Sequence, residues 1–199
     1  GKGLKAAYDV YMQAVKRKRM KPSDLNNKMG MISGTLDYTG FSNADIVIEA
    51  VVENMDVKKK VFAELCQNVP AKTILATNTS SLSVTEMGSV VKDPSKVIGF
   101  HFFNPVHRMP LIEIITTPKT SQETLVSTLE FAKRLGKTPI IVKDAPGFLV
   151  NRILLAYINE AGRLLEEGGT IEGLDKIATD FGMPMGPFLL SDEVGLDVG

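Results

Sequence analysis

The chain has 199 residues, 44% of them hydrophobic and 23% charged, and its 23 basic and 23 acidic residues give a formal net charge of zero. This balance provides no strong field for nucleic acid or an acidic membrane surface, and no apolar run reaches the roughly 18 residues that a membrane-spanning helix needs. The single cysteine, Cys66, excludes a disulfide framework and a cysteine-rich zinc site. We therefore expect a globular protein that binds neither nucleic acid nor a metal and does not insert into a membrane.

The first predicted element is a helix over residues 3–20, in which apolar side chains recur at helical spacing. The N-terminus lacks the apolar stretch of a signal peptide, so secretion is not expected. The helix ends in a basic run over residues 16–19. This run suits the negative end of the helix dipole as a solvated last turn, and a phosphate contact is the alternative. A short helix is expected to begin at Pro22. Because the sequence opens in the middle of a helical pattern, we expect a truncated N-terminal end.

Strand-like and helix-like segments alternate from there on. Strands are predicted over residues 31–36, 45–52, 73–77, 97–103, 111–116 and 138–142, and helices over residues 57–66, 82–88 and 121–135. The segment DIVIEAVV at 45–52 is a nearly continuous apolar run, which is typical of a strand buried on both faces of a parallel sheet. Ser121 is a predicted N-cap and Gly136 a predicted C-cap. The alternation predicts an α/β fold with a parallel sheet.

The character of the sequence changes after KDAPG at residues 143–147. The rest of the chain is predicted to be helical, over residues 148–167, 171–181 and from Phe188 onwards. Ala145 precedes a proline and is therefore expected to lie outside any helix. We place the domain boundary between Asp144 and Ala145. The predicted organisation is an α/β domain over residues 1–144 and an all-α domain over residues 145–199.

His101 stands in the motif GFHFFNP, at the end of a predicted apolar strand and at the edge where open α/β sheets bind their ligands. Its imidazole can accept a proton near neutral pH. In the next predicted strand, Glu113 places a carboxylate among aliphatic residues, which is costly unless the carboxylate is paired. A His–Glu pair would fix the imidazole tautomer and stabilise the imidazolium. The strand register is invisible in the sequence, so a structural histidine in the core stays open as the alternative.

Polar residues also follow two other predicted strands and begin one helix. The motif NTSS supplies Asn78 and Ser80 after a strand, either as ligand-binding groups or as the N-cap of the next helix. In the same way, Glu53 follows DIVIEAVV, with Lys58 in the next helix. Asn151 lies in the first turn of a later helix and is expected to face back towards the sheet.

A dinucleotide-binding domain should carry a G-x-G-x-x-G loop and, about 20 residues later, an acidic residue for the ribose. Neither is present, because Gly1, Gly3, Gly30 and Gly34 do not form the pattern. Taken alone, this absence argues against NAD, but it also fits a chain whose first βαβ unit has been removed. In that case the strand at 45–52 would form an apolar, unpaired edge, and the isolated chain would tend to associate.

The motifs ATNTSSL, GFHFFNPVHRMPLIEII, KDAPGFLVNRIL and GMPMGP occur in this order, at a spacing like that of the L-3-hydroxyacyl-CoA dehydrogenases. The segment DIVIEAVVENMDVKKKVF is similar to the third βα unit of that family. The chain resembles the family over almost its whole length. NPVHRMP is more similar to the dehydrogenase part of multifunctional fatty-acid β-oxidation proteins than to the single-function enzymes. The resemblance implies a Rossmann-like, doubly wound sheet without its first βαβ unit, followed by the start of an all-α C-terminal dehydrogenase domain.

The resemblance also implies a reaction, namely oxidation of a (3S)-3-hydroxyacyl-CoA to the 3-oxoacyl-CoA with NAD as the hydride acceptor. It makes His101 the general base and Glu113 the carboxylate that orients it. Substrate-binding roles fall to Ser80, Asn104 and Asn151. Cofactor-binding roles fall to Glu53, Lys58, Asn78, Ser80 and Asn104. The CoA-contacting Ser and Lys of single-function members fall near Ala7 and Ala14, so the CoA contacts are left open.

The implied partners are the 3-hydroxyacyl-CoA substrate and either a second copy in a homodimer or a multifunctional β-oxidation protein or complex with hydratase and thiolase activities. The implied compartment is the cytoplasm in a bacterium or archaeon, and the mitochondrial matrix or peroxisome in a eukaryote. The isolated chain is expected to be inactive. Two alternatives stay open: a related dehydrogenase of a 3-hydroxy acid without CoA, and a non-catalytic fragment that binds no cofactor.

Overall fold

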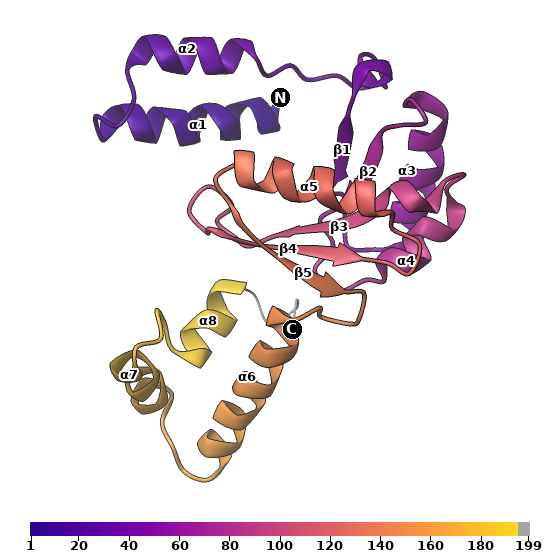
Figure 1. Cartoon of the computed structure of the whole chain (residues 1–199). Coiled ribbons are helices and arrows are strands. Elements are labelled where there is room, and N and C mark those ends of the chain that lie inside the picture. Colours follow the sequence, from indigo (N-terminus) through magenta and orange to yellow (C-terminus); the bar gives the residue numbers. More distant parts are fainter. Residues whose placement is uncertain (195–199) are drawn as a thin grey trace. The chain divides into compact units, whose positions relative to one another are not determined.

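In a computed structural model, residues 1–194 are described, and the chain divides into two compact units after Asn43 (Figure 1). The first unit contains α1 (Lys2–Lys16), α2 (Pro22–Gly30) and the short 3₁₀ helix η1 (Phe41–Asn43). The two α-helices pack against each other, with Leu25 buried between them and the sequence around it exposed. The basic run over residues 16–19 is exposed at the end of α1.

Residues 31–36 form no strand, so that prediction is wrong. The segment leaves α2 without regular structure, and the side chains of Met31 and Leu36 are exposed. No strand among the described residues pairs with it. An alternation of apolar residues can provide one face of a strand, but the backbone still needs a hydrogen-bonding neighbour.

The second unit is built on a five-stranded sheet in the order β1-β2-β3-β4-β5 (Figure 1). The strands are β1 (Ile46–Glu49), β2 (Ile74–Thr77), β3 (Val97–Phe102), β4 (Leu111–Thr116) and β5 (Thr138–Lys143). Between β1 and β3 lie α3 (Met55–Asn68), α4 (Val84–Met87), η2 (Gly88–Val90) and η3 (Pro94–Lys96). The predicted Rossmann-like α/β fold class is confirmed, because strands and helices alternate and most neighbouring strands are parallel.

The sheet differs from the wholly parallel arrangement expected, because β3 and β4 run antiparallel. The connection over residues 103–110 is shorter than the dozen or so residues that a parallel crossover needs. The chain therefore turns back and pairs β4 directly alongside β3.

At the edge of the described sheet, β1 is shorter than the predicted strand at 45–52. Its only neighbour in the described part of the chain is β2, and residues 46–48 are half-buried rather than buried. The strand ends at Glu49, whose side-chain Oε1 accepts the N–H of Val51 at 2.6 Å. Val51 and Val52 are exposed beyond this turn. The expectation of a strand buried on both faces is thus wrong for these residues.

The main core lies between the sheet and α5 (Gln122–Arg134). Its fully buried members are Ala76, Ile98, Phe100, Ile112, Ile114 and Ala132. The predicted N-cap is confirmed, because the hydroxyl of Ser121 accepts the N–H of Thr124 at 3.1 Å. Gly136 follows the end of α5 with a left-handed φ of 73°. These two ends hold α5 against one face of the sheet.

The opposite face of the sheet carries the candidate catalytic side chains. Side chains alternate along a strand, so Val97, Gly99 and His101 share this face of β3. A Cβ built on Gly99 would lie only 2.7 Å from the Cβ of Ile115 on β4. Glycine at this position therefore permits the close approach of β3 and β4 next to His101.

Three helices follow the sheet, namely α6 (Val150–Glu166), α7 (Ile171–Phe181) and α8 (Pro187–Val194). The helix predicted over residues 171–181 is confirmed, and α6 begins slightly later than predicted because Phe148 has a positive φ of 48°. Ala145 lies outside any helix, as expected. The domain boundary between Asp144 and Ala145 stays a prediction. None of the described helices combines the length and apolar character needed to cross a membrane.

Candidate active site

His101 on β3 and Glu113 on β4 are directly opposed in the antiparallel pair. Nδ1 of His101 lies 2.7 Å from Oε2 of Glu113, and both residues are buried. Opposed residues of an antiparallel pair project from the same face, so the register of β3 on β4 brings the two side chains together. With Nδ1 held by a carboxylate, the neutral imidazole carries its proton on Nδ1 and presents Nε2 as a proton acceptor.

The second carboxylate oxygen of Glu113 is held by the start of α6. Oε1 accepts the backbone N–H groups of Leu149 and Val150, each at 3.0 Å. Burial opposes ionisation of this carboxyl. The hydrogen bonds from His101, Val150 and Leu149, together with the charge of His101, outweigh burial and hold the pKa of Glu113 below its usual range. Glu113 is therefore an anion at neutral pH.

Two aromatic rings flank the imidazole of His101. The ring centroid of Phe103 lies 4.7 Å from that of His101, and the centroid of Phe148 lies 5.7 Å away. The positive φ of Phe148 costs about 1–2 kcal/mol for a residue with a large side chain. This strained residue immediately precedes Leu149 and Val150, so the turn at Phe148 places a ring beside His101 just before the chain reaches the carboxylate of Glu113.

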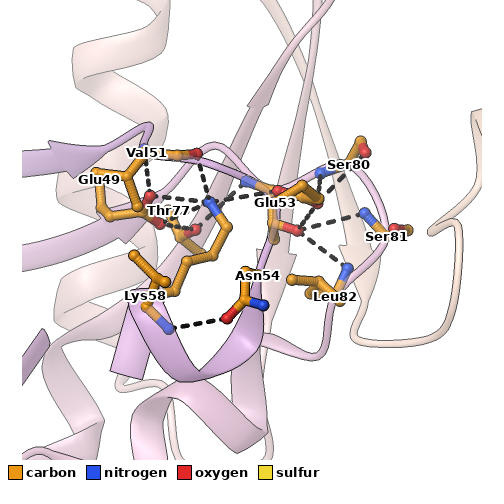
Figure 2. A network of polar contacts seen from close by, with 11 residues as sticks. Glu49, Val51, Glu53, Asn54, Lys58, Thr77, Ser80, Ser81 and Leu82 are labelled. Carbon is orange, nitrogen blue, oxygen red and sulfur yellow. Dashed lines mark hydrogen bonds and ion pairs between the residues drawn. The ribbon is translucent and has the colours of Figure 1, made fainter. Parts of the chain in front are cut away.

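A second polar network lies at the carboxyl ends of β1 and β2 (Figure 2). Oε1 of Glu53 accepts the hydroxyl of Thr79 and the N–H of Ser80, the latter at 3.0 Å. Oε2 of Glu53 lies 3.3 Å from Nζ of Lys58. Burial opposes ionisation of Glu53, but the hydrogen bonds from Thr79 and Ser80 and the charge of Lys58 outweigh it and hold the pKa of Glu53 below its usual range. Glu53 is thus an ionised acceptor, and its side chain is 40% exposed.

Lys58 lies deeper than Glu53 in the same network. Its Nζ donates to both carboxylate oxygens of Glu49, at 2.8 and 3.1 Å, and to the carbonyl of Val51 at 3.3 Å. The residue is 1% exposed. Lys58 is therefore surrounded by oxygen atoms of the protein (Figure 2). The side chain of Glu53, in contrast, is exposed.

The predicted asparagines take different places. Nδ2 of Asn151, at the start of α6, donates to the carbonyl of Ser80 at 3.1 Å. Oδ1 of Asn78 accepts the N–H of Phe102 at 2.9 Å and so ties the end of β2 to the end of β3. Asn104 is exposed in the connection after β3. The structure therefore joins Asn151 to the polar network through Ser80, whereas the side chain of Asn78 links two strand ends and Asn104 lies outside the network.

Sequence reasoning missed several residues that hold these side chains. Glu49 ends an aliphatic strand, which is the same signal that singled out Glu113, and it could have been found in that way. Thr79 lies inside the NTSS motif. The carboxylate of Asp144 accepts the N–H of Thr85 at 2.7 Å and caps α4 from the end of β5. A cap supplied from so far along the chain leaves no local signal.

Two family models together match almost the whole chain. The family model described as 3-hydroxyacyl-CoA dehydrogenase, NAD binding domain, matches residues 1–145, and the model of the C-terminal domain of 3-hydroxyacyl-CoA dehydrogenase matches residues 147–199. The chain belongs to the 3-hydroxyacyl-CoA dehydrogenase family. The resemblance indicated by the sequence motifs is thereby confirmed.

Relatives of this 3-hydroxyacyl-CoA dehydrogenase family member include longer proteins. The fatty acid oxidation complex subunit alpha of Idiomarina loihiensis is 50% identical over 195 residues, which cover 98% of this chain and 28% of that subunit. The chain thus spans little more than a quarter of that relative. Among solved structures, (S)-3-hydroxybutyryl-CoA dehydrogenase PaaH1 from Ralstonia eutropha has a TM-score of 0.94 and 38% identity, covering 98% of this chain and 70% of that chain. The 3-hydroxybutyryl-CoA dehydrogenase from Escherichia coli K12 has a TM-score of 0.94 and 35% identity, covering 99% and 42%.

In this member of the 3-hydroxyacyl-CoA dehydrogenase family, the start of α6 contacts both the His101–Glu113 pair and the polar network at the ends of β1 and β2. The N–H of Val150 binds Glu113, and the next residue, Asn151, binds the carbonyl of Ser80. The arrangement combines a proton acceptor held by an anion with an exposed carboxylate that can accept hydrogen bonds from hydroxyl groups. It is suited to removing a proton from an alcohol beside a ligand that carries hydroxyls.

Proposed function

We propose that the whole protein oxidises a (3S)-3-hydroxyacyl-CoA to the 3-oxoacyl-CoA, with NAD as the hydride acceptor. The observation that carries the proposal is the buried contact between His101 and ionised Glu113, in a chain of the 3-hydroxyacyl-CoA dehydrogenase family. An imidazole held by a carboxylate is suited to accept a proton from an alcohol. The similarity to a subunit of a fatty acid oxidation complex supports a thioester as the substrate class.

The residues at the ends of β1 and β2 fit a ribose of NAD. The exposed, ionised carboxylate of Glu53 can accept hydrogen bonds from sugar hydroxyls, and the hydroxyl of Ser80 lies 3.4 Å from it. Ligands of open α/β sheets bind at the carboxyl ends of the strands. We assign Glu53 and Ser80 to the ribose, with Asn78 and Asn104 as further contacts and Lys58 supporting Glu53. When bound, NAD supplies the hydride acceptor, and the hydride chemistry is that of the cofactor.

The protein's own contribution is proton transfer and positioning. His101 takes the proton of the substrate hydroxyl at Nε2 while the C–H bond of the same carbon breaks. Glu113 stabilises the imidazolium, because its carboxylate lies 2.7 Å from Nδ1. The hydroxyl of Ser80 and the amide of Asn104 orient the substrate oxygen. Asn151 contributes from α6, where it already holds the carbonyl of Ser80.

The test uses the whole protein and two candidate substrates, a (3S)-3-hydroxyacyl-CoA and the same 3-hydroxy acid without CoA, with NADH formation as the readout. Turnover of the thioester alone is the expected result. Equal or faster turnover of the free acid would favour the alternative of a dehydrogenase that needs no CoA. Failure to form NADH with either substrate, together with failure to bind NADH, would refute the proposal.

We also propose that the helices after the sheet contact another protein chain. Large apolar side chains are exposed there, with Ile177 66% and Phe181 88% exposed. Exposed apolar surface of this kind often marks an interaction site. The similarity to a complex subunit supports either a homodimer or an assembly with hydratase and thiolase activities. A monodisperse monomer in sedimentation velocity at high concentration would contradict the homodimer. Purification of the whole protein without hydratase or thiolase activity would contradict the assembly.

A further inference from the structure

Glu49 and Lys58 form an ion pair in the interior of the sheet unit. Glu49 ends β1 and Lys58 lies in the first turn of α3 (Figure 2). Their side chains are 0% and 1% exposed. Burying two charges is costly, and replacing such a pair by apolar residues is often neutral or stabilising. Stability alone therefore does not explain why these two residues occupy the position.

The polar atoms of the pair are engaged inside the protein. Oε1 of Glu49 accepts the N–H of Val51 at 2.6 Å as well as Nζ of Lys58, and Oε2 accepts the hydroxyl of Thr77 at 2.7 Å. Nζ of Lys58 has three protons to donate. Its acceptors are the carboxylate of Glu49, the carbonyl of Val51 and, at 3.3 Å, Oε2 of Glu53. Lys58 therefore acts on Glu53 rather than on a ligand.

We propose that Glu49 is a positioning residue for Glu53. The three charged groups carry one positive and two negative charges. Because Glu49 neutralises Lys58 in the interior, the remaining negative charge lies on Glu53, the exposed member of the three. Without Glu49, Lys58 and Glu53 would form a neutral pair, and the carboxylate of Glu53 would be drawn towards Lys58. Glu49 thus keeps Glu53 available for the hydroxyls of a ligand, and this part rests on the proposed NAD function.

The same contacts extend to the loop after β2. Oε1 of Glu53 accepts the N–H of Ser80 at 3.0 Å and the hydroxyl of Thr79. Lys58 holds one oxygen of Glu53, and the other oxygen holds the loop. Glu49 therefore influences the position of Ser80 through two intervening side chains, and this part is independent of any cofactor.

The decisive comparison in the whole protein is a cycle of Glu49→Gln, Lys58→Met and the double substitution, because Lys58 itself contacts Glu53. Glu49→Gln alone would leave a buried cation short of a partner and can prevent folding. The double variant removes both charges with little change in volume, so its folding stability should be close to that of the wild type. Lys59→Met is the matched control, because it removes a lysine of the same helix whose partner is the exposed Glu86 at 2.6 Å.

We expect two changes in Glu49→Gln, in which Lys58 draws Glu53 inwards, and no further effect of Glu49→Gln once Lys58 has been replaced. Amide hydrogen exchange at Ser80 in the cofactor-free protein should accelerate on the order of tenfold. NADH should bind on the order of tenfold more weakly, as for the loss of one hydrogen bond to a charged group. Lys59→Met should change neither quantity.

Wild-type exchange at Ser80 and wild-type NADH affinity in a folded Glu49→Gln variant would overturn the proposal and leave Glu49 as a structural residue. Effects of Glu49→Gln that are the same with and without Lys58 would also overturn it. Should Glu49→Gln not fold, Thr77→Val takes its place, because it removes one hydrogen bond to Glu49 without changing a charge. Unchanged exchange at Ser80 in that variant would also overturn the proposal. If the wild type bound no NADH, the proposed function would fail, but exchange at Ser80 would still test the role of Glu49.

Discussion

The backbone N–H of Val150 lies 3.0 Å from Oε1 of Glu113, the carboxylate whose other oxygen contacts His101. The orientation of the imidazole therefore depends on a helix outside the sheet. N–H groups at a helix start favour an anion, which agrees with the lowered pKa of Glu113. A shift of α6 would loosen the carboxylate and, with it, the imidazole.

Replacing the proposed base should separate chemistry from cofactor binding. We expect His101→Ala in the whole protein to lower turnover by about 10²–10⁴-fold, the usual contribution of a positioned general base. NADH affinity should stay near the wild-type value, because the proposed ribose contacts, Glu53 and Ser80, come from the ends of other strands. Steady-state kinetics and NADH titration measure the two quantities. A variant with nearly full turnover would exclude His101 as the base.

Glu113→Gln should keep the size of the side chain and remove its charge. The amide can still accept an N–H from Val150, but it lacks the negative charge that stabilises the imidazolium of His101. We expect lower turnover in a variant that stays folded, as measured by kinetics alongside circular dichroism. Unchanged turnover would mean that Glu113 is a structural residue of the α6 contact.

The same carboxylate should make folding stability depend on pH. The pKa of Glu113 is lower in the folded protein than in the unfolded chain, so its ionisation contributes stability above the ordinary glutamate pKa. That contribution is lost as the pH falls from the ordinary value through the lowered one. The difference in unfolding free energy between wild type and Glu113→Gln should therefore shrink across this window. Denaturant unfolding at a series of pH values checks this, and a constant difference would speak against it.

Gly99→Ala should destabilise the protein by about 1–3 kcal/mol, the usual cost of overpacking a core. The added Cβ would lie 2.7 Å from the Cβ of Ile115, on the strand pair that carries His101. Turnover should fall as well. Gly162→Ala in α6 is the matched control, because its Cβ meets nothing within 4 Å and alanine is favoured over glycine in a helix by about 0.5–1 kcal/mol. Urea unfolding of both variants tests the contrast, and equal effects would contradict it.

Asp144→Ala should weaken the capping of α4, in which the N-cap residue Ser83 would still accept the N–H of Glu86. The carboxylate of Asp144 accepts the N–H groups of Val84 and Thr85, and loss of such a cap typically costs about 1 kcal/mol. Asp180→Ala is the control, because that carboxylate forms an exposed pair with Lys176 within one helix and should matter little. A thermal unfolding midpoint that falls no further for Asp144→Ala than for the control would disprove the capping role.

Residue type was enough to single out His101 and Glu113, because a histidine at a strand end and a carboxylate among aliphatics are both unusual. Their contact could not be derived in the same way, since a shift of one residue in the register would turn one side chain to the other face. The donors from Leu149 and Val150 are backbone groups, which every residue except proline carries. The argument that singled out Glu113 also applies to Glu49, because Glu49 follows a run of aliphatic residues in β1.

The strand predictions show the limit of apolar patterns. Residues 31–36 and 45–52 both have strand-like sequences, but a strand forms only where a neighbour supplies hydrogen bonds. In the described chain, β1 extends over the residues that pair with β2 and no further. The predicted strands over residues 97–103 and 111–116 are separated by a connection too short for a parallel crossover. The antiparallel pairing of β3 and β4 could therefore have been predicted from the sequence.

Because β3 and β4 form a hairpin, His101 and Glu113 are delivered by one continuous stretch of chain, residues 97–116. The ladder between the strands sets their spacing, and the connection over residues 103–110 does not. That connection can therefore lengthen, shorten or change its side chains at the tip while the pair stays intact. A variant with altered residues at the tip of this loop should therefore keep the contact between His101 and Glu113.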